Sequence, residues 1–500
     1  MSKADQTLSR KMAGGAVWML SARMLMRASG LINVMILARL LPPADFGVVG
    51  LTVALIGAFE AVSDLSMNAA IVRHPKPEKK HYDTAFTIAL LRGLLIGGLA
   101  LLCAEPMADF YGDERLKYVA WALAAQAVIF GLTNTGTADF QRDFTFGTDF
   151  LYLAARKLGG SVASIGFALT IWPDYRALVA GLIVGSITSV LASFVLHPMR
   201  PRISFEAFRE LFGFSKWMLA TNLLDFAHRR VDALILGKTL GLAPLGIHAL
   251  AMELANLVAN DFAQPLRRAT MPGFAKLQSN LKELRHQFAA AYGASMVFAV
   301  PFALGVALVA EPAIRLAFGP DWAAAAPPLR ILCIYGLAGA SVQFCWPLLV
   351  SMGEPKRFAP LQIGTLILGA PAIWWASVNF GLIGAAWAMS AMSATYAVLV
   401  MRSSLSLVEG SIRDVVDWVP RCLGAGLAMA LAVRAVQAFL PYDGGASLAA
   451  VSLFGSIAVG AITYPVALWL LWRMSGRPES VESRILNMAG GMVAGHLRKA

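Results

Sequence analysis

Long apolar runs, separated by short polar segments, recur from one end of this chain to the other. Each run is about 20 residues long, the length that an α-helix needs to cross the roughly 30 Å hydrocarbon core of a bilayer. The runs lack the alternation of apolar and polar residues that marks the strands of a membrane β-barrel. The pattern therefore predicts an all-α integral membrane protein with about fourteen transmembrane helices. These helices are expected near residues 13–38, 46–70, 83–104, 117–138, 149–171, 177–197, 214–237, 243–265, 289–310, 324–350, 359–378, 381–402, 418–439 and 446–472.

Composition and charge support this assignment. Of the 500 residues, 58% are hydrophobic and 14% are charged, whereas a soluble domain carries about 25% charged residues. The net charge is +12, but Lys and Arg gather in alternate short connections such as 73–81 and 267–286, while the acidic stretch 104–114 lies on the other side. This bias orients membrane proteins. We therefore expect both termini in the cytoplasm and no nucleic-acid partner.

A twelve-residue sequence occurs twice at the predicted outer ends of helices. "ILARLLPPADFG" (36–47) and "ILGKTLGLAPLG" (235–246) are identical at five of twelve positions without a gap. Six predicted helices separate the copies, and because that number is even, both copies cross the membrane in the same direction. This is a parallel repeat, related by an axis along the membrane normal. The alternative is chance similarity, since turns favour Gly and Pro.

The repeat predicts how the chain is divided. Two pseudo-symmetric six-helix lobes would comprise residues 1–198 and 199–403, followed by a C-terminal helix pair (404–473) and a cytoplasmic amphipathic tail (474–500). Two lobes with a polar seam at the membrane midplane are typical of transporters.

Charged and amide side chains interrupt the apolar runs of the first, second, seventh and eighth predicted helices. A charge at the bilayer centre costs at least about 2.5–3.5 kcal/mol, so such residues usually face protein or water and serve function. Arg92 is a further candidate, whereas Arg156 and Lys157 are expected near a helix end, with their charges at the membrane surface. The candidate cavity residues are Arg23, Arg27, Glu60, Asp64, Asn68, Asn222, Asp225, Arg229, Asp232, Glu253, Asn256 and Asn260.

Arginine in a partly dehydrated cavity suits a phosphate, because the guanidinium is planar, always charged and able to donate two parallel hydrogen bonds. The acidic residues would keep the empty cavity near neutral, and they could also bind a coupling proton or Na⁺. A purely structural interpretation is that Arg23 and Arg27 neutralise Glu60 and Asp64. No residue pattern predicts another cofactor or a bound metal.

Signals of catalysis are weak in this sequence. It contains no H-E-x-x-H, G-x-S-x-G or zinc-ligand spacing, so we expect no enzymatic activity. Gly237-Lys238-Thr239 matches the end of a phosphate-binding loop, but Asp232 stands where the first glycine is required. The glycine pairs Gly93/Gly97 and Gly181/Gly185 are expected to be sites of close helix packing.

Four segments carry a resemblance to a known family. They are "ILARLLPPADFGVVGL" (36–51), "FQRDFTF" (140–146), "DALILGKTLGLAPLGIHALA" (232–251) and "SMGEPKRF" (351–358). In this order they resemble the polysaccharide-transporter family of the multidrug/oligosaccharidyl-lipid/polysaccharide exporter superfamily, and length and helix count extend the resemblance to nearly the whole chain.

This resemblance implies a bacterial inner-membrane flippase that works by alternating access, with predicted helices 1, 2, 7 and 8 lining a cavity between the lobes. It implies a polyprenyl-diphosphate-linked oligosaccharide as substrate, whose diphosphate Arg23, Arg27 and Arg229 would hold. Membrane lipids and other polysaccharide assembly proteins are the further partners that it implies.

Other functions remain open at this point. A flippase for the peptidoglycan lipid precursor and a cation-coupled multidrug exporter belong to the same class, although a drug exporter should carry fewer deep arginines. A membrane glycosyltransferase, polymerase or ligase usually needs a sizeable extramembrane domain, which the short connections do not provide. A scaffold without transport activity would not require the deep charges.

Overall fold

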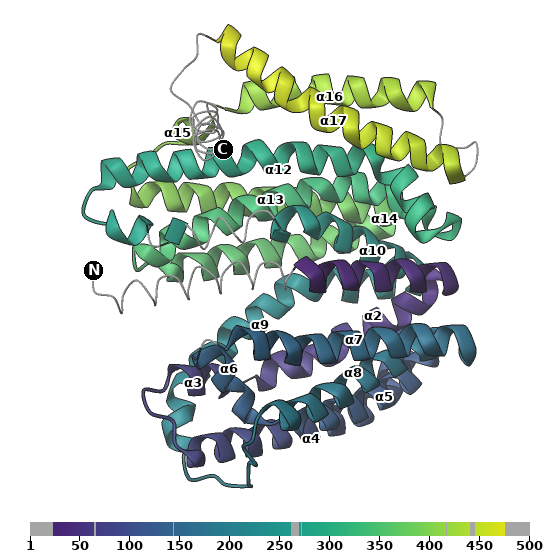
Figure 1. The fold of residues 1–500 in the computed structure, drawn as a ribbon, viewed down its shortest axis with the longest axis vertical. Coiled ribbons are helices and arrows are strands. Elements are labelled where there is room, and N and C mark those ends of the chain that lie inside the picture. Colours follow the sequence, from purple (N-terminus) through teal and green to yellow (C-terminus); the bar gives the residue numbers. More distant parts are fainter. Residues whose placement is uncertain are drawn as a thin grey trace, which may run out of the picture. The chain divides into compact units, whose positions relative to one another are not determined.

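The computed structural model describes residues 24–64, 67–143, 145–261, 270–271, 273–416, 418–440 and 446–475, and for residues 146, 211–221, 258–261, 355 and 446 it describes the backbone only. All regular secondary structure in these ranges is helical (Figure 1). The chain divides into two compact units, residues 1–246 and 247–500.

The first unit begins with a helix that is described over residues 24–40. It continues with α2 (Pro43–Ser63), α3 (Met67–Arg73), α4 (Lys79–Tyr111), α5 (Arg115–Gly131), α6 (Ala138–Arg142), α7 (Phe146–Thr170), α8 (Tyr175–Leu196) and α9 (Phe208–Thr239). Helix α10 (Leu242–Asp261) starts in this unit and ends in the second.

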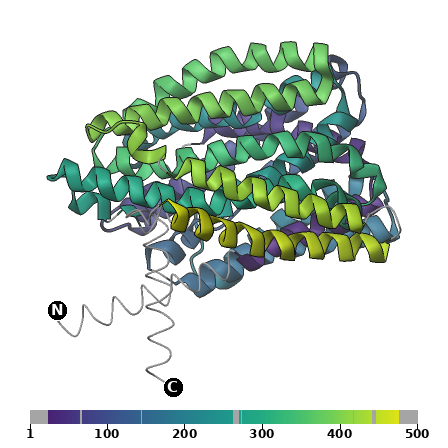
Figure 2. The same cartoon turned by 90° about the horizontal axis from the view of Figure 1, so that it is seen from above.

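The second unit is also built of long helices. They are α12 (Leu281–Phe318), α13 (Ala326–Ser351), α14 (Phe358–Leu407), α16 (Val419–Phe439) and α17 (Ala446–Met474), with the single turn α15 (Arg413–Val416) between α14 and α16. Helices α16 and α17, yellow-green and yellow, lie side by side in both views (Figures 1 and 2). They bury Met429, Val433 and Tyr464 against Val297 of α12.

The protein is a multi-pass membrane protein. Within the described residues, eight helices are long and apolar enough to cross a bilayer, or nine if the bent pair Arg115–Gly131 and Thr135–Arg142 forms one span. Each predicted span overlaps a helix. The number fourteen itself stays a prediction, because several of these helices do not meet the criteria of length and hydropathy.

The second predicted helix differs from the structure in continuity. The predicted helix 46–70 is broken, because α2 ends at Ser63, Asp64 is extended (φ −78°, ψ 99°) and α3 begins at Met67. Expecting Glu60, Asp64 and Asn68 on one continuous helix was therefore wrong. In α14, Gly381 has φ 62°, and Gly384 lies against the carbonyl oxygen of Ala376. The chain folds back there, so α14 comprises two helices, as predicted for 359–378 and 381–402.

Small residues let neighbouring helices of the first unit approach closely. A Cβ atom added to Gly93 of α4 would lie 2.7 Å from the carbonyl oxygen of Ala127 in α5. A Cβ at Gly181 of α8 would lie 2.8 Å from the carbonyl oxygen of Gly160 in α7. Helices in lipid associate largely by such close packing, because lipid removes the hydrophobic driving force between them. The structure thus confirms the packing role predicted for these glycines.

The two copies of the repeated sequence contact each other. A Cβ at Gly47 would overlap the carbonyl oxygen of Leu242, and a Cβ at Gly246 would overlap the carbonyl oxygen of Pro43. Gly47 and Gly246 are equivalent in the repeat, and so are Pro43 and Leu242. The contact is therefore reciprocal, as expected for two copies related by a pseudo-twofold axis, and all four residues belong to the first unit.

Candidate functional site

Most of the predicted cavity residues lie in the first unit. Arg27 is half-buried on the helix over residues 24–40, Asp64 and Asn222 are also half-buried, and Asp232 is 8% exposed. The remaining predicted residues of this unit are exposed, namely Glu60, Asn68, Asp225 and Arg229.

Four predicted residues stand apart from this set. Arg23 lies outside the described residues, and so does the side chain of Asn260. Glu253 is exposed and Asn256 is half-buried, and both lie on the part of α10 that belongs to the second unit.

Arg92 of α4 reaches the broken end of α2 with its whole guanidinium group. Its Nε donates to Ser63 Oγ at 3.2 Å, its Nη2 donates to the carbonyl oxygen of Glu60 at 3.0 Å, and its Nη1 lies 3.7 Å from Asp64 Oδ1. The last carbonyl groups of a helix have no partner within it, and arginine often supplies one. Arg92 therefore satisfies the end of α2 and balances the Asp64 carboxylate.

Asn222 of α9 binds the same break from another side. Its Nδ2 donates to the carbonyl oxygen of Asp64 at 3.4 Å and to Asp64 Oδ2 at 3.3 Å. Asp64 thus joins α2, α4 and α9 at a single point. The sequence indicated Asp64 and Asn222, with Arg92 as a further candidate. It could not show that Arg92 meets the end of α2, because about thirty residues separate them in the chain.

Arg229 and Asp225 form an ion pair on α9. Arg229 Nε donates to Asp225 Oδ2 at 2.8 Å, so the two residues share a helix face, as their spacing predicted. The Arg229 side chain is 68% exposed. The carboxylate contacts only the Nε side of the guanidinium, and the exposed part can therefore reach an anionic group.

Lys157 is a further cation of the first unit, and its position on its helix differs from the one expected. It is near the middle of α7, which has 25 residues, and its side chain is half-buried. A Cβ atom at Gly30 would lie 2.5 Å from Lys157 Nζ, so the ammonium group rests on the helix over residues 24–40. The expectation that Arg156 and Lys157 lie near a helix end was therefore wrong, because both are near the middle of α7.

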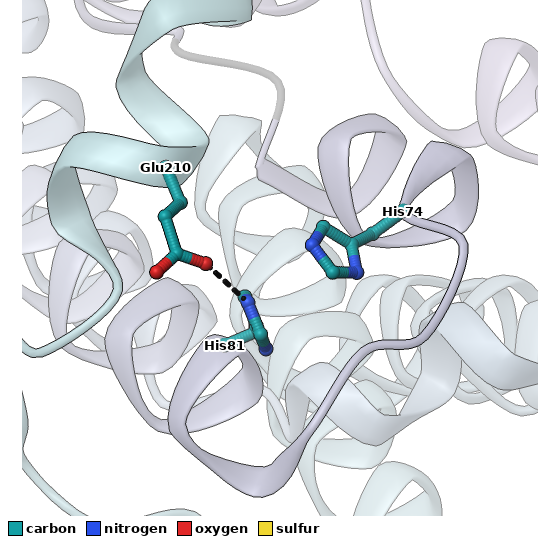
Figure 3. Close-up of side chains that lie close together, drawn as sticks. All are labelled: His74, His81 and Glu210. Atoms are coloured by element: carbon teal, nitrogen blue, oxygen red, sulfur yellow. Dashed lines mark hydrogen bonds and ion pairs between the residues drawn. The ribbon is translucent and has the colours of Figure 1, made fainter.

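A histidine–carboxylate cluster joins the start of α4 to the start of α9. His81 is 2% exposed, and its Nε2 lies 2.9 Å from Glu210 Oε2. The His74 ring lies beside it, with 4.3 Å between ring centroids. Figure 3 shows both imidazoles turned towards the Glu210 carboxylate. The hydrogen bond from His81, together with the charge of Lys80, lowers the pKa of Glu210.

The donor atoms of this cluster suit a metal ion. One ligand atom from each residue lies within 4.8 Å of the others, and two imidazoles with one carboxylate are zinc-type ligands. The hydrogen bonds of His81, however, already indicate which of its two ring nitrogens carries the proton. Its Nδ1 accepts from the Glu78 backbone N–H at 2.9 Å, so Nε2 carries the proton and donates it to Glu210. We therefore describe the three residues as a hydrogen-bonded clamp, the His81–Glu210 clamp.

Curated relatives of this chain are named for polysaccharide biosynthesis and transport. The succinoglycan biosynthesis transport protein ExoT of Rhizobium meliloti is 23% identical over 92% of this chain and 91% of that protein. The lipopolysaccharide biosynthesis protein WzxC of Escherichia coli is 22% identical over 76% of this chain and 77% of that protein. The teichuronic acid biosynthesis protein TuaB of Bacillus subtilis is 21% identical over 67% and 70%.

Solved structures share the fold. The lipid II flippase MurJ in an inward closed conformation covers 92% of this chain and 100% of its own, with a TM-score of 0.70 and 13% identity. A multidrug resistance MATE family transporter in an inward-facing conformation covers 77% of this chain and 94% of its own, with a TM-score of 0.61 and 14% identity.

The family assignment comes from a sequence model that covers more than half of the chain. This model, described as "Polysaccharide biosynthesis protein", matches residues 36–327, a region that includes both copies of the repeat. The chain belongs to this polysaccharide biosynthesis protein family.

Proposed function

We propose that this protein is a flippase that moves polyprenyl-diphosphate-linked oligosaccharides across the bacterial inner membrane. The observation that carries the proposal is the similarity to a succinoglycan transport protein over 92% of the chain. The fold supports transport, because a lipid II flippase shares it over 92% of this chain and a multidrug resistance transporter shares it over 77%. Alternating access between the lobes 1–198 and 199–403, with both termini in the cytoplasm, belongs to the same proposal.

Arg23, Arg27 and Arg229 would bind the diphosphate of the lipid. A guanidinium group binds a phosphate through two parallel hydrogen bonds and keeps its charge at any physiological pH. Arg27 and Arg229 lie on helices that begin the two repeats, and Arg229 is exposed. Asp225 holds Arg229 in place until a phosphate takes over part of its hydrogen bonding. The glycan would occupy the polar surface of Glu60, Asn68, Asn256 and their neighbours, while the prenyl tail stays in lipid.

The anionic character of the substrate separates this proposal from the two nearest alternatives. A cation-coupled multidrug exporter has no need for several arginines within its helices, and such charges are expensive in a membrane. A peptidoglycan-precursor flippase would share the diphosphate site, so the arginines do not separate it from our proposal. The names of the relatives favour surface and secreted polysaccharides.

Reconstitution of the purified protein tests the proposal directly. A polyprenyl-diphosphate-linked sugar with a fluorescent label is placed in both leaflets of proteoliposomes, and a membrane-impermeant reductant bleaches the outer leaflet. We expect the wild-type protein to expose the inner-leaflet label to bleaching. Protein-free vesicles should keep about half of the fluorescence, and exchange no faster than in these vesicles would exclude the proposed function.

Arginine variants then test whether Arg27 and Arg229 bind the diphosphate. Loss of one charged hydrogen bond costs about 1.5–3 kcal/mol, so Arg27→Gln and Arg229→Gln should each slow flipping about tenfold or more. Arg156→Gln is the matched control, since the Arg156 guanidinium packs on the Phe130 ring, 4.6 Å from its centroid. Flipping at the wild-type rate by the double variant of Arg27 and Arg229 would show that these two arginines are not needed to bind the diphosphate.

A further inference from the structure

Lys157 lies near the middle of α7, a helix that the sequence predicts to cross the membrane, and an ammonium group there would need a specific reason to be. The helix has 25 residues, and at a rise of about 1.5 Å per residue Lys157 is roughly 16–20 Å from either end. A charged residue at that depth almost always faces a partner or a water-filled cavity, and usually serves function. The helix over residues 24–40 supplies the surface on which this ammonium lies.

Independent contacts fix the register between these two helices. Ser164 Oγ of α7 donates to Asn33 Oδ1 at 3.3 Å, and farther along Leu37 and Ala168 are buried in one cluster. Lys157 lies two turns before Ser164 on α7, whereas Gly30 lies about one turn before Asn33, so the long lysine side chain extends along the helix pair to reach Gly30. The position of its ammonium therefore follows from how the helices pack, and Gly30 provides the space because it has no side chain.

Gly30 occupies a position in the first repeat that can be compared with the second repeat. In the ungapped alignment of residues 36–47 with 235–246, continued towards the N-terminus, Gly30 is equivalent to Arg229. Gly30 is also three residues from Arg27, on the same face of its helix. The second repeat thus carries its cation on the helix itself. In the first repeat the equivalent position is empty of side chain, and the ammonium of Lys157 fills that space from the neighbouring helix.

We propose that Lys157 is a phosphate-binding residue of the first repeat, the counterpart of Arg229 in the second. This inference rests on the proposed function. An ammonium group binds a phosphate as a point charge and needs no bidentate geometry, so a lysine that arrives from another helix can replace an arginine. The bound group would be the diphosphate of the polyprenyl lipid, reached together with Arg27.

A variant that moves the positive charge from Lys157 to position 30 tests this inference. We expect Lys157→Ala to weaken the binding of polyprenyl diphosphate to the purified protein in nanodiscs, and to slow flipping, by about tenfold or more. The double variant Gly30→Arg/Lys157→Ala moves the cation to the position that Arg229 occupies in the second repeat. It should recover most of the lost affinity. Arg156→Ala, one residue away on another helix face, should bind like the wild type.

A second lysine variant and a competition measurement distinguish phosphate binding from a structural role. Lys157→Met retains the apolar stem and removes only the charge, so it should weaken lipid binding about as much as Lys157→Ala does, without a fall in the thermal unfolding temperature. Inorganic pyrophosphate competing with the labelled lipid shows whether the diphosphate alone is recognised. If it competes with the wild type but not with Lys157→Met, the lysine binds the phosphate itself, whereas equal competition with both proteins would contradict that role.

The outcomes separate this inference from the proposed function. If Arg229→Gln loses binding while Lys157→Ala and Lys157→Met bind like the wild type, Lys157 is not a phosphate ligand, although the flippase proposal stands. Failure of Gly30→Arg to restore binding, combined with a lowered unfolding temperature in both lysine variants, would make Lys157 a structural residue. If the wild-type protein neither binds nor flips the lipid, the proposed function fails first.

Discussion

Arg92 shows how a single deep charge can serve structure rather than substrate. Its three contacts all go to the last turn of α2 and the residue that follows, namely Glu60, Ser63 and Asp64. An arginine so engaged has few donors left for a ligand, in contrast to the exposed Arg229. Among deep cations, the number of contacts within the protein therefore distinguishes a structural residue from a candidate binding residue.

We predict that Arg92→Gln destabilises the protein by about 1–3 kcal/mol, since it removes the charged donor that Arg92 supplies to a helix-end carbonyl and to the Asp64 carboxylate. Arg92→Lys should restore little, because one ammonium group cannot reproduce contacts from Nε, Nη1 and Nη2. The thermal unfolding of the purified variants measures this. Arg209→Gln, an exposed arginine of α9, is the control, and an unchanged unfolding temperature for Arg92→Gln would contradict the assignment.

At the scale of elements, the ends of helices determine much of the first unit. The start of α2 packs on the start of α10 through the reciprocal glycine contact, and the end of α2 is held by Arg92 and Asn222. The start of α4 is tied to the start of α9 by the His81–Glu210 clamp. Elements far apart in sequence are thus joined at their termini, where backbone groups lack partners within the helix.

The reciprocal glycine contact predicts opposite effects of the same substitution at two positions of α2. Gly50→Ala should be neutral or stabilising by up to about 1 kcal/mol, because alanine favours a helix and a Cβ there meets nothing within 4 Å. Gly47→Ala should destabilise the protein by about 1–3 kcal/mol, as overpacking does, since its Cβ would overlap the Leu242 carbonyl. Thermal unfolding compares the two, and equal effects would mean that the turns are not in tight contact.

The His81–Glu210 clamp predicts a pH dependence with a definite sign. The pKa of Glu210 is lowered by the hydrogen bond from His81 and by Lys80. Its stabilising contribution is therefore complete above the unfolded carboxyl pKa of about 4.3. That contribution is lost as the pH falls through the lower folded pKa.

We thus expect the unfolding temperature of Glu210→Gln to lie below that of the wild type at pH 7, with the difference shrinking below about pH 4. Glu206→Gln, an exposed glutamate just before the start of α9, should show no such difference. A gap between Glu210→Gln and the wild type that stays constant down to pH 3 would show that the carboxylate charge contributes nothing to the clamp.

At the scale of the whole molecule, orientation follows from the distribution of Lys and Arg among the connections. This predicts that Asp109, next to the end of α4, lies outside the cell and that Lys76 and Glu409 lie in the cytoplasm. All three residues are exposed. Of the native cysteines, Cys333, Cys345 and Cys422 are buried, so replacing the half-buried Cys103 by alanine leaves little background for thiol labelling.

Labelling intact cells with an impermeant maleimide tests this orientation. Asp109→Cys should react from outside, whereas Lys76→Cys and Glu409→Cys should react only after the cells are permeabilised. External labelling of Glu409→Cys, with Lys76→Cys protected, would require an odd number of spans between these residues and would contradict the ten that are predicted there.

The sequence by itself determined the fold class, the approximate positions of the helices, the repeated turn and the family. These depend on local features, namely the length of apolar runs, their boundaries and short motifs, which each segment carries regardless of its neighbours. Only the tertiary structure decided which partner each charge has. Arg92 meets Asp64, Lys157 lies on Gly30 and His81 binds Glu210 because helices distant in sequence pack at particular registers and rotations. Such registers depend on side-chain packing between helices, which no single segment encodes.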